Sequence, residues 1–326
     1  MKKLFKILLF IFSGIFILLI GTLTYMKVAL PNVGPAPEMK VDMSRERIER
    51  GKYLANHVSV CMDCHSGRDW NKFAGPMIEG TLGAGGEEFS QKFGFPGAFY
   101  AQNISPIGLG NWTDGEIFRA ITSGVSKNGT ALFPVMPHPA YGKMDEEDIK
   151  CIIAYLRTLR PVGKKAPESK SDFPMNFIIN TIPQKPDFHY IPDSTDQIAY
   201  GKYIYTAAAC SDCHTKQDKG SKIEGMEDAG GFEFPLPYSG TVRSSNITPD
   251  KETGIGNWTE DQFVKRFKAY SDSAARNMTV QAGRFNTTMP WTMYAGMKEG
   301  DLKALYAYLK TIPPVKNKVV LFSPKE

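Results

Sequence analysis

The chain begins with an apolar segment, residues 7–26 (ILLFIFSGIFILLIGTLTYM), that contains no charged residue. About 20 apolar residues form a helix long enough to cross a bilayer core about 30 Å thick. We therefore expect a single-pass membrane anchor within residues 1–29 and a linker over 30–44. The lysines that precede the segment predict a cytoplasmic N-terminus and a body on the periplasmic side of the inner membrane. A removed signal peptide is the alternative, although Val28-Ala29 makes a poor cleavage site.

Helical periodicity appears in the rest of the chain. Within 144–159 the apolar residues Ile149, Ile152, Ile153 and Leu156 follow the i, i+3, i+4, i+7 spacing of an amphipathic helix. The segments TDGE (113–116) and TEDQ (259–262) each match a capping box, which predicts a helix start. No sustained alternation of apolar and polar residues predicts a strand, so the expected fold class is all-α.

Three blocks of sequence occur twice and in the same order. GKYLANHVSVCMDCH (51–65) pairs with GKYIYTAAACSDCH (201–214), and NISPIGLGNWTDGEIF (103–118) pairs with NITPDKETGIGNWTEDQF (246–263). The third pair is VMPHPAYGKMDEEDIKCIIAYLRTLRPV (135–162) and TMPWTMYAGMKEGDLKALYAYLKTIPPV (288–315). Two copies are too few for a solenoid. We expect two tandem domains, 45–163 and 197–318, each with its own core, joined by a Pro-rich linker over 164–196.

The formal net charge is +5, but the positions of the charged residues argue against a nucleic-acid partner. Lys2, Lys3, Lys6 and Lys27 flank the apolar segment and leave the body of the chain almost neutral. Nucleic-acid binders carry a basic stripe or patch, and none is visible here.

Four of the five cysteines lie in two pentads, CMDCH (61–65) and CSDCH (210–214). A thioredoxin-like redox pair needs a βαβ context, which is absent, and leaves the histidine unexplained. A structural zinc site needs four close ligands, and five histidines supply two such sites only awkwardly. C-x-x-C-H is the attachment signal for haem c, which favours that cofactor over the redox and zinc alternatives.

The spacing of the pentad suits haem chemistry. On a helical turn the two thiols lie on one face and reach the two vinyl groups of one porphyrin, and the histidine that follows reaches the iron. We expect two covalently bound haem c groups. The attachment residues are Cys61, Cys64, Cys210 and Cys213, and the first axial ligands are His65 and His214.

A second axial ligand is expected from the third block, where Met136-Pro137 and Met289-Pro290 match. A thioether is a soft ligand that favours ferrous iron and raises the reduction potential. Methionine also fills gaps in cores, so a packing role is the alternative. His138 is the rival ligand in the first copy, but the second copy has no histidine there.

Other candidates are weaker. Trp112 and Trp258 match between the copies and are either haem-pocket residues or ordinary core aromatics. Cys151 aligns with Ala304, which indicates a small core residue, and His57 is expected at the surface or between helices.

The body resembles the cytochrome c subunits of membrane-bound alcohol, aldehyde and gluconate dehydrogenases. The resemblance rests on RGKYL…CMDCH, NITPDKETGIGNWTEDQF and LFPVMPHPAYGKMDEEDIKCIIAYL, and covers most of 45–163 and 197–315. It implies class I cytochrome c domains with His/Met-ligated haem, in which the first and last helices cross, Gly51 against Tyr155 and Gly201 against Tyr308. Those subunits typically have three haem domains and a cleaved signal, whereas this chain has two and an expected anchor.

The resemblance implies an electron carrier that relays electrons between a dehydrogenase or other respiratory donor and a terminal oxidase, another cytochrome or quinone. Such a carrier does no bond chemistry of its own, because both irons are saturated. The competing class is a dihaem enzyme, a peroxidase or a sulfur-compound oxidase, which needs one open haem site. The matched Met-Pro pairs argue against that class.

Overall fold

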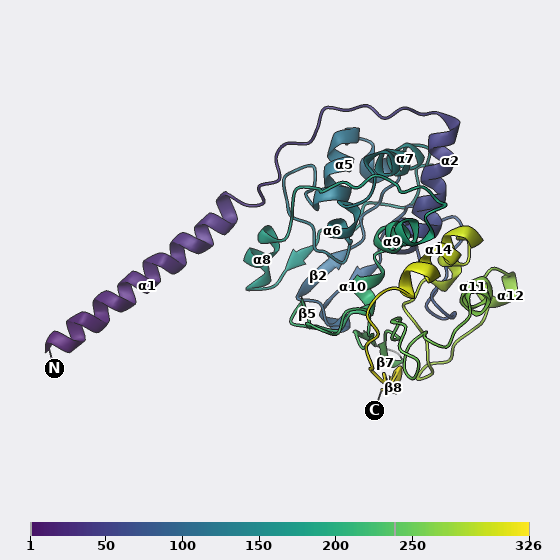
Figure 1. The fold of residues 1–326 in the computed structure, drawn as a ribbon. Coiled ribbons are helices and arrows are strands. Elements are labelled where there is room, and N and C mark those ends of the chain that lie inside the picture. The colour runs from purple at the N-terminus through teal and green to yellow at the C-terminus, as the bar shows by residue number, and fades with distance from the viewer. Residues whose placement is uncertain (1, 238, 326) are drawn as a thin grey trace.

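The computed structural model describes residues 2–237 and 239–325. Helix α1 (Lys2–Val28) contains the apolar segment and stands away from the rest of the molecule (Figure 1). None of its residues is buried, and among the described residues it is the one helix long and apolar enough to cross a membrane. Its length and composition fit a membrane anchor or a signal sequence.

Residues 45–163, called the N-terminal half below, are built around the crossing of α2 (Arg45–Tyr53) and α7 (Glu146–Arg157). The helices meet at Gly51, where a Cβ atom would lie 1.7 Å from the carbonyl oxygen of Cys151. Only glycine admits so close an approach of two backbones.

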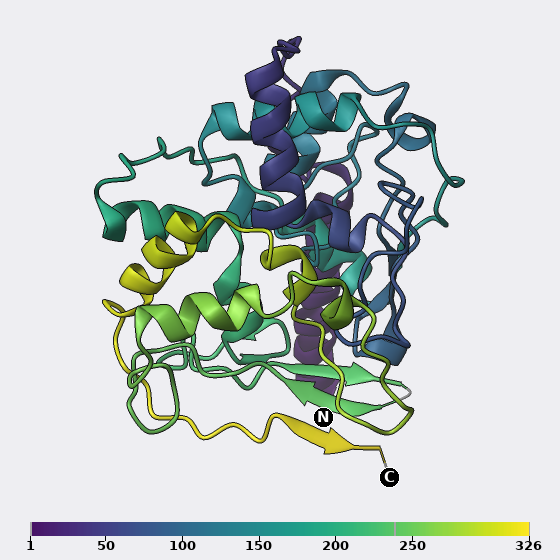
Figure 2. The same cartoon turned by 90° about the vertical axis from the view of Figure 1, so that its right-hand side faces the viewer.

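Residues 197–318, the C-terminal half, repeat this arrangement with α9 (Gln197–Ala207) and α14 (Glu299–Leu309), which lie side by side in Figures 1 and 2. A Cβ atom on Gly201 would lie 1.9 Å from the carbonyl oxygen of Ala304. The crossing of the first and last helices, which the resemblance implies, is therefore present in both halves.

The first helix of the N-terminal half differs from its counterpart by a π-turn, η1 (Leu54–Val58), that follows α2. Within it the Ser59 amide donates to the carbonyl of Leu54 over 2.8 Å. The segment 51–61 is one residue longer than 201–210. A π-turn absorbs one inserted residue without breaking a helix, so η1 keeps the rest of the two halves in register.

Both predicted capping boxes are formed. Thr113 caps α5 (Asp114–Ser123): its hydroxyl accepts from the Glu116 amide at 3.1 Å, and Glu116 accepts from the Thr113 amide at 2.8 Å. The matched pair that caps α11 (Glu260–Lys268) is Thr259 and Gln262. These contacts satisfy amides that a helix start leaves without intrahelical partners.

The remaining helical elements are short. They are α3 (Cys61–Cys64), η2 (Gln91–Phe93), α4 (Pro106–Leu109), α6 (His138–Tyr141), α8 (Met175–Ile178), η3 (Ile179–Thr181), α10 (Cys210–His214), α12 (Ser273–Arg276) and α13 (Trp291–Tyr294).

The expectation of an all-α fold is wrong in detail, because eight short strands occur among the described residues beside the helices, which make up 40% of the chain. Three small antiparallel sheets occur among the described residues, in the orders β1-β2-β3, β4-β5 and β6-β7-β8. The strands are β1 (Glu88–Phe89), β2 (Gly97–Tyr100), β3 (Lys170–Ser171), β4 (Gln217–Asp218), β5 (Ser221–Lys222), β6 (Glu233–Leu236), β7 (Gly240–Arg243) and β8 (Phe322–Pro324). Strands of two to four residues leave no period-2 pattern to detect.

The segment predicted as a linker, 164–196, lies against the N-terminal half. Its strand β3 pairs with β2, and the ring of Phe188 packs at a tilt against that of Phe118, with centroids 5.5 Å apart. Further along, α8 contacts the C-terminal end of α1, where Lys27 Nζ lies 5.1 Å from the ring centroid of Phe177.

Most buried apolar residues form one core that spans both halves, rather than the two separate cores expected, and a second, small cluster contains Tyr270, Ala275 and Ala295. The largest cluster contains Leu54 and Ile153 from the N-terminal half together with Ile204 and Leu302 from the C-terminal half. Each of these four side chains is fully buried. The two halves therefore pack against each other through apolar surface.

Candidate haem-binding sites

Each C-x-x-C-H segment begins at a backbone corner. Val60 has a φ of 43°, a left-handed conformation that is unfavourable for a β-branched residue. The hydroxyl of Tyr141 donates to the preceding carbonyl, that of Ser59, over 2.8 Å. The matched residues of the C-terminal half are Ala209 (φ 50°), Tyr294 and Ala208, with a bond of 3.2 Å. A buried tyrosine thus holds the same corner in both halves.

The paired cysteines follow the corner on a single helical turn, α3 or α10, so both thiols of a pair point to one side. All five cysteines of the chain are free thiols. Burial raises the pKa of Cys61 and of Cys213 to about 12, and it raises the pKa of Cys64 and Cys210 further. Each of these four thiols is therefore protonated at neutral pH.

The histidine that ends each segment is held by one ring nitrogen. His65 Nδ1 lies 2.6 Å from the carbonyl oxygen of Gln102, and His214 Nδ1 lies 2.8 Å from that of Ser245. Because a carbonyl only accepts, Nδ1 carries the proton and Nε2 keeps its lone pair. Among the described residues Nε2 of neither ring has a hydrogen-bond partner. Burial lowers the pKa of both imidazoles, which keeps them neutral and able to bind iron.

An asparagine next to each of these carbonyls fixes the loop. The Asn103 side chain donates to the Val162 carbonyl at 2.8 Å and accepts from the Ser105 amide at 2.9 Å. In the C-terminal half the corresponding contacts join Asn246 to Val315 and Thr248, at 2.8 and 2.9 Å. The sequence analysis does not predict this role for Asn103 and Asn246, although the two residues begin matched triplets, NIS and NIT.

Met136 and Met289 lie at matched places, each two residues before a short helix, α6 or α13. Both side chains are half-buried and pack against the core cluster. Backbone hydrogen bonds from His138 to Met136 (2.7 Å) and from Trp291 to Met289 (2.8 Å) give the two loops the same turn. The position of either sulfur over an iron stays a prediction.

His138 is the alternative to Met136 as an iron ligand in the N-terminal half. Its imidazole lies against Gly124, where a Cβ atom would come 2.4 Å from Nε2, and Nε2 has no partner among the described residues. Burial lowers the pKa of His138 to about 4, so the ring is neutral. Its counterpart Trp291 stacks on Tyr270, with centroids 5.2 Å apart, which is an ordinary packing role.

The two tryptophans occupy different environments. Trp112 is half-buried and lines a cavity of about 130 Å³ together with Gln102 and Asn103, which belong to the loop that holds His65. Trp258 is 37% exposed. Among the described residues neither indole N–H donates a hydrogen bond, so both roles considered for these residues stay predictions.

The charges beside the two sites differ. Asp63 and Arg68 form an ion pair at 2.9 Å whose side chains are only 6% and 5% exposed. Burial raises the pKa of Asp63 to about 6 although Arg68 opposes the shift. The corresponding Asp212 pairs with Lys222 at 3.1 Å near the surface. The two sites thus have the same backbone conformation but differ in the charged side chains around it.

Two further residues lie where helices pack. Cys151 is buried on α7, as predicted, and burial raises its pKa to about 11. His57, in the π-turn, reaches the other half: its Nδ1 lies 2.9 Å from the carbonyl oxygen of Met293.

The donor set fits haem c. Each half presents a thiol pair on one side of a helical turn and a neutral imidazole with a free Nε2. Among the described residues no group of three His, Cys, Asp or Glu side chains is arranged to hold a metal ion.

The family model for cytochrome c matches residues 198–313. The chain is 27% identical over 298 residues to the cytochrome c subunit of a quinone alcohol dehydrogenase from Gluconacetobacter polyoxogenes, covering 86% of this chain and 59% of that subunit. It is 28% identical to the cytochrome subunit of fructose dehydrogenase from Gluconobacter japonicus, covering 89% and 58%.

A third relative is a dihaem cytochrome c-type protein from Cereibacter sphaeroides, 26% identical over 78% of this chain and 82% of that protein. The resemblance to the cytochrome c subunits of dehydrogenases is thereby confirmed. The chain spans about three fifths of the length of the dehydrogenase subunits it matches.

Proposed function

We propose that this relative of the dehydrogenase cytochrome c subunits is a membrane-anchored electron carrier with one haem c in each half. The observation that carries the proposal is the repeated site geometry. In both halves a C-x-x-C pair adjoins a histidine whose Nδ1 is fixed by a carbonyl and whose Nε2 is free. The dihaem relative supports the count of two.

The chain's own residues would hold the cofactor. Thioether bonds would form at Cys61, Cys64, Cys210 and Cys213, with His65 and His214 on one side of each iron and Met136 and Met289 on the other. Haem c supplies reversible one-electron chemistry when bound. The protein's part is to fix the imidazole, supply a soft thioether that favours the ferrous state, and exclude water from the ring.

A carrier fits this arrangement better than an enzyme. Histidine and methionine ligands would together leave no position for a substrate at either iron, and the matched methionines would give both sites the same ligand set.

We place the carrier at the inner membrane, with α1 in the bilayer and both halves on the periplasmic side. The apolar length of α1 and the lysines before it support this topology. A tether raises the effective concentration of the carrier near its membrane partners. Those partners are a dehydrogenase or other respiratory donor on one side, and a terminal oxidase, another cytochrome or quinone on the other.

Optical spectroscopy tests the proposal. The chain is produced in a host that attaches haem c, the charge-transfer band of Met–Fe(III) is recorded, and carbon monoxide is added to the reduced protein. We expect two Met-ligated haems that do not bind the gas. Rapid binding at one iron would instead favour a dihaem enzyme with an open site, and peroxide and sulfur compounds would then be assayed.

A further inference from the structure

The two halves contact each other through matched residues. Tyr53 on α2 donates its hydroxyl to Asp301 Oδ2 in the first turn of α14, over 2.5 Å. Tyr203 on α9 donates to Asp148 Oδ2 in the first turn of α7, over 2.6 Å. The repeated blocks align Tyr53 with Tyr203 and Asp148 with Asp301. We call these two contacts the reciprocal Tyr–Asp pairs.

Each tyrosine hydroxyl also accepts a backbone hydrogen bond from the other half. The Lys298 amide donates to Tyr53 Oη at 2.9 Å, and the Asp145 amide donates to Tyr203 Oη at 3.2 Å. Lys298 and Asp145 are the N-cap residues of α14 and α7. One hydroxyl therefore binds both the cap and the first turn of the last helix in the opposite half.

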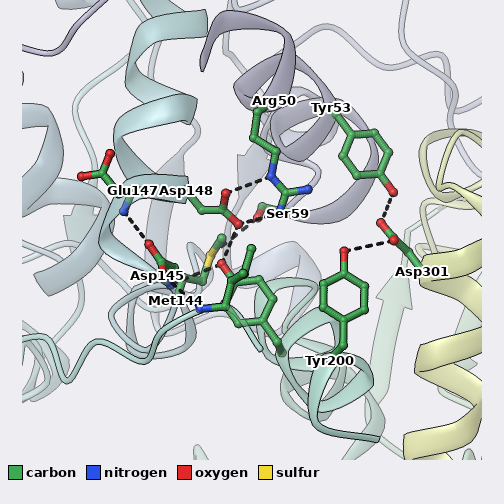
Figure 3. Close-up of polar contacts among 11 residues, drawn as sticks. Arg50, Tyr53, Ser59, Met144, Asp145, Glu147, Asp148, Tyr200 and Asp301 are labelled. Atoms are coloured by element: carbon green, nitrogen blue, oxygen red, sulfur yellow. Dashed lines mark hydrogen bonds and ion pairs between the residues drawn. The ribbon is translucent and has the colours of Figure 1, made fainter. Parts of the chain in front are cut away.

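The two aspartates are further held within their own halves. Arg50 donates two hydrogen bonds to Asp148, at 2.9 and 2.7 Å, and Tyr200 donates to Asp301 at 3.1 Å (Figure 3). Asp148 and Asp301 are 5% and 6% exposed. A buried carboxylate requires such partners, so loss of one hydroxyl removes support from a group that water does not reach.

The reciprocal Tyr–Asp pairs bring the haem-binding segments of the two halves together. Helix α6 contacts α9, and in the matched contact α13 packs against η1. Helices α6 and α13 follow the candidate ligands Met136 and Met289. The elements that they contact, α9 and η1, precede Ala209 and Val60, the left-handed residues before the C-x-x-C-H segments.

We infer that the reciprocal Tyr–Asp pairs are positioning residues for electron exchange between the two haem sites. They hold the attachment segments of the two halves in one fixed relation, and electrons cross the chain there. With a haem c bound in each half, one electron would pass from the reduced cofactor of one half to the oxidised cofactor of the other, and no bond would be made or broken. The inference rests on the proposed function, since exchange requires two haems.

The test replaces both hydroxyls in the full chain, as Tyr53→Phe with Tyr203→Phe, and keeps both rings. We measure the exciton couplet in the Soret circular dichroism, which depends on the distance and orientation of two haems, and the exchange rate after flash reduction. The couplet should fall at least two-fold and the rate at least ten-fold, with two haems still bound. Tyr306→Phe is the matched control: it removes a hydroxyl that donates to the Trp258 carbonyl within the C-terminal half, over 2.6 Å, and should leave both readouts unchanged.

Amide hydrogen exchange gives a readout that needs no haem, and single variants serve if the double variant does not fold. Tyr53→Phe should speed exchange at the Lys298 amide at least ten-fold and leave the Asp145 amide unchanged. Tyr203→Phe should do the reverse.

The outcomes separate this inference from the proposed function. A wild-type chain with fewer than two haems overturns the proposed function and the inference with it. Two bound haems with no couplet in the wild type, or with the same couplet and exchange rate in the double variant, overturn the inference alone.

Discussion

A single hydrogen bond decides what each candidate histidine can do. The carbonyls of Gln102 and Ser245 fix the protons of His65 and His214 on Nδ1, so the free Nε2 is the only ring atom left to bind iron. The sequence predicted the histidines because their place after C-x-x-C is local. It did not predict the carbonyls, which come from residues 37 and 31 positions away.

The methionine ligands can be tested one at a time. Met136→Ala and Met289→Ala should each remove about half of the Met–Fe(III) charge-transfer band and lower the potential of one haem by on the order of 0.1 V, because a soft thioether is lost. Optical redox titration measures both effects. Met144→Leu, in the buried core, should leave the band intact. A full band in either alanine variant would show that another side chain binds that iron.

His57 should make stability depend on pH. Burial lowers the pKa of His57 below its ordinary value of 6.5, and Lys268, Arg276 and Lys52 act in the same direction. The unfolded chain therefore takes up the proton first as the pH falls, and stability is lost progressively below about pH 6.5. His57→Asn, which keeps a donor for the Met293 carbonyl, should lose less stability than wild type between pH 7.5 and pH 5 in urea unfolding. Equal losses would contradict the prediction.

At the scale of elements, patterns within a few residues of each other predicted the helices correctly, whereas strands that depend on distant partners were not predicted. The capping boxes at Thr113 and Thr259 and the amphipathic last helices follow from residues three or four positions apart. The π-turn was readable in principle from the one-residue difference between 51–61 and 201–210. The short strands were not, because β3 and β8 are defined by partners in distant segments.

The helix crossings should be intolerant of any side chain. Gly51→Ala places a Cβ atom 1.7 Å from a backbone oxygen and should lower the free energy of unfolding by about 3 kcal/mol or more. Gly300→Ala is the control, because nothing lies within 4 Å of its Cβ position, and alanine in α14 should stabilise by up to about 1 kcal/mol. Urea unfolding compares the two. A loss below about 1 kcal/mol for Gly51→Ala would mean that α2 and α7 separate easily.

At the scale of the whole molecule, the continuous core and the reciprocal Tyr–Asp pairs make the two halves one body. The repeat in the sequence predicts two similar units but carries no signal for how they pack. That relation depends on Tyr53 meeting Asp301, 248 positions away. The domain boundaries and the anchor role of α1 remain predictions.

Removal of α1 should release the protein from the membrane without loss of haem. Within the described residues α1 makes its main helix contacts with α8 and η3, and none of its residues is buried. A chain that starts at residue 30 behind a cleavable export signal should fractionate as soluble and show the full haem spectrum. Membrane association without α1 would indicate a second attachment to the bilayer.

The most direct test of the account is to count covalent haem in three proteins by intact mass and by the pyridine haemochrome spectrum. These are the full chain, the variant with Cys61→Ala and Cys64→Ala, and the variant with Cys210→Ala and Cys213→Ala. We predict two haems in the first and one in each of the others. One haem or none in the full chain, or an unchanged count in either variant, would contradict the claim that both halves carry a haem c.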